Sequence, residues 1–100
     1  MALFECGGKT INISVDMFQN LIGYSSYFPT EIGKHYILLM HAQNASAISP
    51  AITGATKVNT PRTISTLSSG GSLMVCEIEA TATQVRPDQN YVYNYTLIEC

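Results

Sequence analysis

The sequence predicts an all-β domain, and three observations lead to this prediction. Isoleucine and threonine, which favour strands, are abundant, whereas only 12% of the residues are charged, about half the usual quarter. Hydrophobic and polar residues alternate along several short segments, as expected when successive strand side chains point to opposite faces. Glycine, proline and asparagine break the chain between these segments at intervals of roughly 8–12 residues. We therefore predict a single antiparallel β-sandwich domain over residues 1–100, jelly-roll-like, with six to eight short strands.

The N-terminal part is predicted to begin with a β-hairpin. Residues 2–6 (ALFEC) can form a short edge strand, and residues 9–15 (KTINISV) alternate strictly between apolar and polar side chains. Gly7 and Gly8 lie between the two segments and favour a tight turn. Residues 16–23 (DMFQNLIG) contain the one helical signal, so at most one short helix is expected there, with an irregular strand as the alternative. The inward positions of the second strand are Ile11, Ile13 and Val15.

The middle of the chain combines a loop with two kinds of strand. Residues 24–33 are expected to form a surface loop with aromatic anchors. Residues 34–43 contain an apolar run on both parities, which indicates either a strand covered on both faces or a central strand whose outer face meets another subunit. Residues 47–58 are interrupted by Pro50 and Gly54, which is typical of an edge or bulged strand.

The C-terminal part contains the clearest alternation. Residues 59–71 are polar and carry at most one short strand, whereas residues 72–83 (SLMVCEIEATAT) predict a strand with one buried face and one mostly solvent-exposed face. Residues 86–90 are expected to form a turn, and residues 91–99 the last strand. The inward positions of the 72–83 strand are Met74, Cys76, Ile78, Ala80 and Ala82.

Composition argues against several classes of partner. The formal net charge is −2 with five Lys and Arg, and no basic run is present, so we expect neither nucleic-acid binding nor attraction to an anionic membrane. No apolar run approaches the roughly 20 residues of a membrane span, and the first residues do not resemble a signal peptide. We therefore expect the chain to remain in the cytoplasm or to leave it by lysis or assembly.

The ionisable residues predict no catalytic, cofactor or metal site. Glu77 and Glu79 share a strand face about 6.6 Å apart, but any Glu-x-Glu on a strand produces this separation, so we expect them to be solvated. His35 and His41 lie too far apart along one strand to bind one metal ion together. The three widely spaced cysteines are expected to be reduced structural thiols. The chain is therefore predicted not to be an enzyme.

Aromatic residues supply the candidate interaction surface. Three tyrosines of the last strand share a parity, and three aromatic residues crowd the 24–33 loop. Such rings serve either as core or as a contact surface, because tyrosine is enriched at protein interfaces and exposed rings also stack on sugars. The candidate interaction residues are Tyr24, Tyr27, Phe28, Tyr91, Tyr93 and Tyr95.

Three short motifs resemble those of small β-sandwich structural proteins of bacteriophages and prophages, of the tail-tip, fibre-associated or head-decoration type. They are the Gly33-Lys34-x-Tyr36 strand entry, the turn at residues 54–56 (GAT) and the ending at residues 95–98 (YTLI). The resemblance implies a non-enzymatic virion component that forms homo-oligomers, often trimers, and contacts other virion proteins. It carries over no binding residue. The alternative is a carbohydrate-binding β-sandwich module that uses its surface tyrosines.

Overall fold

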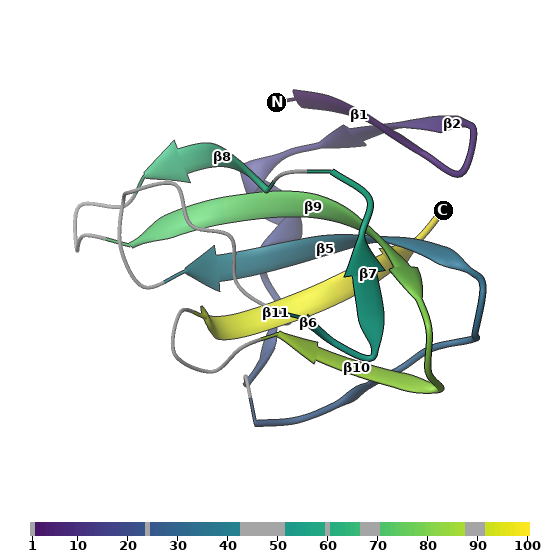
Figure 1. The fold of residues 1–100 in the computed structure, drawn as a ribbon. Helices are drawn as coiled ribbons and strands as arrows, with labels where there is room; N and C mark the ends of the chain where they lie inside the picture. Colours follow the sequence, from purple (N-terminus) through teal and green to yellow (C-terminus); the bar gives the residue numbers. More distant parts are fainter. Residues whose placement is uncertain (1, 24, 43–51, 60, 67–70, 88–91) are drawn as a thin grey trace.

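The computed structural model of the chain describes residues 2–23, 25–42, 52–59, 61–66, 71–87 and 92–100 (Figure 1). The predicted all-β class is confirmed. These residues contain eleven strands rather than six to eight, because two-residue pairings at β3, β4 and β6 add to the longer strands. The elements are β1 (Ala2–Cys6), β2 (Lys9–Ile13), the 3₁₀ helix η1 (Val15–Met17), β3 (Ile22–Gly23), β4 (Phe28–Pro29), β5 (His35–Ala42), β6 (Ile52–Thr53), β7 (Ala55–Lys57), β8 (Arg62–Thr66), β9 (Ser72–Ala80), β10 (Gln84–Pro87) and β11 (Val92–Glu99).

The strands form three antiparallel sheets. The main sheet has the order β3-β11-β5-β9-β7, with β8 also paired to β9, and the other two sheets are β4-β10-β6 and the β1–β2 hairpin. Figure 1 shows the hairpin on one side of the main sheet and β10 on the other. The main sheet is therefore the middle layer, and this layered arrangement is compatible with the predicted β-sandwich.

Each face of the main sheet has its own hydrophobic core. The core beneath β4-β10-β6 consists of Tyr36, Leu38, Met40, Ala42, Met74, Cys76, Ile78, Ala80, Val85, Val92, Tyr95 and Leu97. The core beneath the hairpin consists of Phe4, Cys6, Ile13, Ile37, Leu39 and Val75. The apolar run of β5 is therefore covered on both faces by this chain itself, which decides between the two interpretations of that strand.

Strand β9 differs from its prediction on one face. The predicted inward positions from Met74 to Ala80 are buried, as expected. The other face, predicted to be mostly solvent-exposed, is buried at Leu73, Val75 and Glu77, whereas Glu79 is exposed, as are Thr81 and Thr83 beyond the end of β9 at Ala80. The hairpin packs on this face at Val75, which alternation along β9 alone does not reveal.

The predicted hairpin is confirmed. Gly7 and Gly8 have φ angles of 57° and 82°, and positive values at both turn positions are what a two-residue type I′ turn requires. The second strand ends at Ile13, because η1 begins at Val15. The Val15 side chain is therefore exposed, although it was predicted to face inward. Residues 16–23 thus hold the end of a 3₁₀ turn and then β3, so each alternative for this segment describes part of it.

The interrupted segment predicted at residues 47–58 bends at Gly54, within the described residues 52–58. β6 pairs with β10, whereas β7 pairs with β9, so the chain passes from one sheet to another at this glycine. Gly54 has a φ of 88°, and a Cβ there would collide with the backbone oxygen of Gln84. The turn predicted at residues 86–90 is wrong at its start, because β10 extends to Pro87; residues 88–90 lie outside the described ranges.

Candidate functional site

A β-bulge divides the predicted tyrosine stripe of the last strand. In the pairing of β11 with β5, Val92 lies opposite Ala42 and Asn94 opposite His41, so Tyr93 is the extra residue. Tyr93 is 47% exposed, whereas Tyr95 is fully buried. The prediction that Tyr93 and Tyr95 share one face of the strand is therefore wrong; Tyr91 lies outside the described residues.

Tyr95 is a structural anchor rather than a contact residue. Its hydroxyl lies within hydrogen-bond distance of the carbonyl oxygens of Ser26 and Val85, and its single proton can be donated to either. Burial raises the pKa of Tyr95 to about 12, because the phenolate would lose its hydration. The hydroxyl therefore connects β11 to β10 and to the loop before β4.

The aromatic residues of the 24–33 loop also separate. Phe28 packs half-buried against the core beneath β4-β10-β6. Tyr27 is 41% exposed, and the guanidinium carbon of Arg86 lies 4.9 Å from its ring centroid, a cation–π geometry. Tyr24 lies outside the described residues, so the structure places only Tyr27 of this group at the surface.

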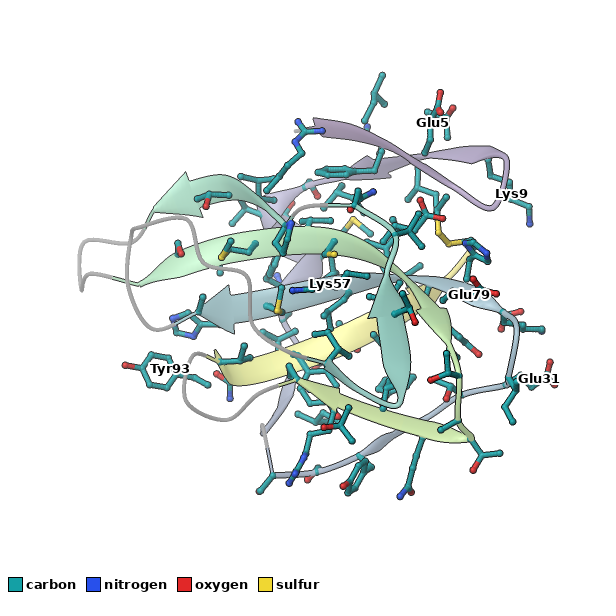
Figure 2. The ribbon with its side chains drawn as sticks, viewed as in Figure 1. Glu5, Lys9, Glu31, Lys57, Glu79 and Tyr93 are labelled. Carbon is teal, nitrogen blue, oxygen red and sulfur yellow. A yellow bond between two sulfur atoms is a disulfide. The ribbon has the colours of Figure 1, made fainter. Side chains whose placement is uncertain are left out.

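Tyr93 contacts a histidine of the neighbouring strand. The rings of Tyr93 and His41 are 5.3 Å apart at 64°, an edge-to-face arrangement, and Nδ1 of His41 lies 3.4 Å from Oδ1 of Asn94. Figure 2 shows Tyr93 projecting outward at one end of the main sheet. The ring edge therefore packs within the chain while much of the side chain is available to a partner.

The structure brings together two ionisable residues that sequence reasoning considered separately. Nδ1 of His35 lies 2.7 Å from Oε2 of Glu77, across β5 and β9. Glu77 is only 8% exposed, so the prediction of a solvated Glu77 is wrong; Glu79 is exposed as predicted. The Glu77 carboxylate can accept a hydrogen bond from the Nδ1–H group of His35.

The His35–Glu77 pair could not be read from the sequence, because nothing local shows that β5 and β9 are neighbours in this register. The described residues hold no group of three or more His, Cys, Asp or Glu suited to a metal ion. Within the same ranges, no helix has the length and hydrophobicity needed to cross a membrane.

A disulfide joins Cys6 of the hairpin to Cys100, and Figure 2 shows it at the right of the molecule. The prediction of three reduced thiols is therefore wrong for this pair, since the fold brings the hairpin turn next to Cys100. The Cys100 amide donates to the His35 carbonyl at 3.1 Å, and a Cβ on Gly7 would lie 3.2 Å from the Cys100 Cβ. The hairpin turn thus covers the His35 end of the sheet.

The remaining cysteine, Cys76, is free and buried, as the sequence predicts. Burial raises the pKa of its thiol to about 11, mainly because the thiolate would be poorly hydrated. Its Sγ lies 3.2 Å from the carbonyl oxygen of Asn59. A thiol in this environment is unreactive, so Cys76 belongs to the core.

The outer edge of β1 is a further candidate contact surface. Strand β1 pairs with β2 along one edge, and no described residue pairs with the other (Figure 1). In a two-residue hairpin the residues flanking the turn, Cys6 and Lys9, bond to each other, and the pattern alternates from there. The backbone groups of Leu3 and Glu5 therefore point away from β2.

The exposed ammonium group of Lys34 forms ion pairs with two carboxylates of the chain. Nζ of Lys34 lies 2.6 Å from Oε1 of Glu99 and 3.3 Å from Oε2 of Glu31. The hydrogen bond to Glu99 is the largest cause of the raised pKa of Lys34, and the same bond lowers the pKa of Glu99. These groups are exposed, so the pairs add little to stability.

No protein-family model, curated protein or solved structure matches this chain. The function is therefore inferred from the residues and their geometry.

Proposed function

We propose that this chain is a non-enzymatic interaction protein whose copies associate through the open edge of β1. The unpaired backbone of this strand is the observation that supports the proposal. Edge strands usually carry charged side chains, proline, a bulge or a covering segment, which hinder pairing with another chain. Strand β1 has no lysine or proline and pairs with β2 without a register shift. Glu5 is its one charged residue, and its Leu3 side chain is 67% exposed.

A second copy fits this edge in antiparallel register. With a two-fold axis beside Phe4, Leu3 lies opposite Glu5 of the other copy, and each such pair can exchange two backbone hydrogen bonds. Figure 2 shows Glu5 on the side of the hairpin away from the main sheet. The two Glu5 carboxylates are not opposite each other in this register, so their repulsion is moderate. The result is a continuous sheet β2-β1-β1-β2.

The proposed contact surface is the edge of a strand and not the face of a sheet. The sequence predicts assembly through apolar strand faces and tyrosine-bearing loops, but both faces of β5 are covered within the chain. Among the tyrosines that the structure describes, Tyr27 and Tyr93 are exposed and available as additional contacts. A role in a phage or prophage particle is supported by the motif resemblance alone.

The tyrosines give less support to the alternative, a carbohydrate-binding module. Sugar stacking needs open ring faces, whereas Tyr95 is buried and the Arg86 guanidinium covers one face of the Tyr27 ring. No described contact arranges two exposed rings side by side.

Two variants with equal starting exposure test the edge proposal. Leu3 and Ile32 are both 67% exposed, but only Leu3 lies on the β1 edge. Size-exclusion chromatography with light scattering should show a dimer of the oxidised wild type at micromolar concentrations. Leu3→Lys should abolish the dimer, and Ile32→Lys should keep it.

A backbone variant separates the edge from the side chain. Leu3→Pro removes an N–H that points away from β2, so the hairpin should remain intact while edge pairing is lost. A wild type that is monomeric at every concentration, or a Leu3→Pro variant that still dimerises fully, contradicts the proposal. Circular dichroism confirms that each variant is folded.

A further inference from the structure

The β1–β2 hairpin is connected to the main sheet by side chains and one covalent bond. It forms a two-stranded sheet of its own, and no described ladder joins it to β3-β11-β5-β9-β7. The chain leaves it at one end, through residues 14–21, which contain η1. Undocking the hairpin therefore breaks no ladder between strands, unlike removal of β5, β9 or β11.

The surface beneath the hairpin is strongly apolar. Ile37, Leu39 and Val75 of the main sheet are fully buried there, and Phe4 and Ile13 contact them from the hairpin side. Exposure of this surface to water is unfavourable, so a displaced hairpin needs an equivalent surface to cover. The one surface with matching shape is the same face of a second copy, which is the condition for domain swapping.

A disulfide holds the hairpin next to the C-terminal residue of the chain. It ties Cys6, on the hairpin, to Cys100, which follows β11, over a sequence separation of 94. Cys6 is almost fully buried, whereas Cys100 is partly exposed. An attacking thiolate therefore reaches the sulfur of Cys100 first.

We propose that the Cys6–Cys100 disulfide is a redox latch, and that its reduction lets the hairpin exchange with that of a second copy. A thiolate of a small dithiol attacks Sγ of Cys100, the bond to Cys6 breaks, and the Cys6 thiolate takes up a proton. The second thiol of the reductant then displaces Cys100, so that two cysteine thiols form and the dithiol becomes a cyclic disulfide. Thiol–disulfide exchange with a small disulfide, which is reduced to two thiols, then joins Cys6 of one copy to Cys100 of the other within the exchanged pair.

This inference deepens the proposed self-association by naming a second surface for the same partner, another copy of the chain. It rests on the proposed function only for the identity of that partner. The two surfaces differ, because the outer edge of β1 stays free in the exchanged form.

Complementary single-cysteine variants test the exchange directly. Cys6→Ser and Cys100→Ser are each prepared with Cys76→Ala, mixed in equal amounts, and oxidised with glutathione disulfide. Exchange places Cys6 of one chain against Cys100 of the other. On a non-reducing gel, the mixed disulfide dimer should therefore be at least ten times as abundant as each of the two homodimers. Random collision gives only the statistical twofold excess, and that result overturns the proposal.

Hydrogen exchange tests the latch in the unaltered chain. Addition of dithiothreitol should reduce the protection of the hairpin amides that bond across the two strands, those of Phe4, Cys6, Lys9, Ile11 and Ile13, at least tenfold, while β5 remains protected. Unchanged hairpin protection in the reduced chain shows that the bond is no latch. The mixed disulfide dimer is also measured in chains that carry Leu3→Lys. Its formation there shows hairpin exchange without edge pairing. Edge pairing is tested separately, by the dimer of the oxidised wild type.

Discussion

Replacement of Tyr95 by phenylalanine tests the assignment of this residue as a buried anchor. Tyr95→Phe removes a hydroxyl that reaches the carbonyl oxygens of Ser26 and Val85, but keeps the ring and leaves no cavity. Because one proton serves two acceptors, the loss should equal about one hydrogen bond, or about 1 kcal/mol at pH 7. With an m-value of roughly 1–1.5 kcal/mol/M, the urea midpoint should fall by about 0.7–1 M.

The same variant should behave differently in alkali. The pKa of Tyr95 is about 12 in the folded chain, against an ordinary value of 10.0. Between these values the unfolded chain has lost the proton while the folded chain keeps it, so wild-type stability falls as pH rises. At pH 11 this loss amounts to about 1.4 kcal/mol, which the phenylalanine variant avoids. The two stabilities should therefore meet at roughly pH 10.5–11.

Urea unfolding at pH 7, 10 and 11, followed by far-UV circular dichroism, measures both effects. Tyr93→Phe is the matched control: its side chain is half exposed, and its midpoint should stay with the wild type at every pH. A stability difference between Tyr95→Phe and the wild type that stays constant or widens from pH 7 to pH 11 refutes the assignment.

Three further predictions concern the glycines and cysteines. At pH 8, alkylation of Cys76 by iodoacetamide should be at least roughly 100-fold slower in the folded than in the unfolded chain, because its pKa lies near 11 rather than 9.0. Gly54→Ala should lower the free energy of unfolding by more than about 3 kcal/mol, and Gly33→Ala, at the same φ of 88° but with open space around it, by only about 1–2 kcal/mol, as measured by urea unfolding. Reduction of the Cys6–Cys100 bond should cost about 4–5 kcal/mol in dilute solution, measured in the same way with and without reductant.

Each of these predictions has a contrary outcome. Equal alkylation rates in folded and unfolded chains would show that Cys76 is accessible. Equal destabilisation by the two glycine replacements would mean that backbone conformation, rather than the close approach of β10 to Gly54, sets the cost. A change below about 1 kcal/mol on reduction would show that the unfolded chain gains little freedom from the loss of the bond.

The sequence by itself determined the features that depend on neighbours along the chain. Alternation identified the all-β class and the inward face of β9, and Gly7 and Gly8 identified the hairpin turn. An apolar run on both parities identified β5 as a strand but left open whether this chain or another subunit covers its second face. These predictions succeed because side-chain direction in a strand and positive φ in a tight turn are local properties.

The tertiary structure decided how these elements meet. Alternation predicted a shared face for Tyr93 and Tyr95, but a bulge set by the pairing with β5 turned Tyr93 outward. Likewise Glu77 is buried beside His35 because β9 pairs with β5. Cross-strand register, the covering of a sheet by a distant hairpin and the contact of the hairpin turn with Cys100 all depend on residues far apart in sequence. No local pattern contains that information.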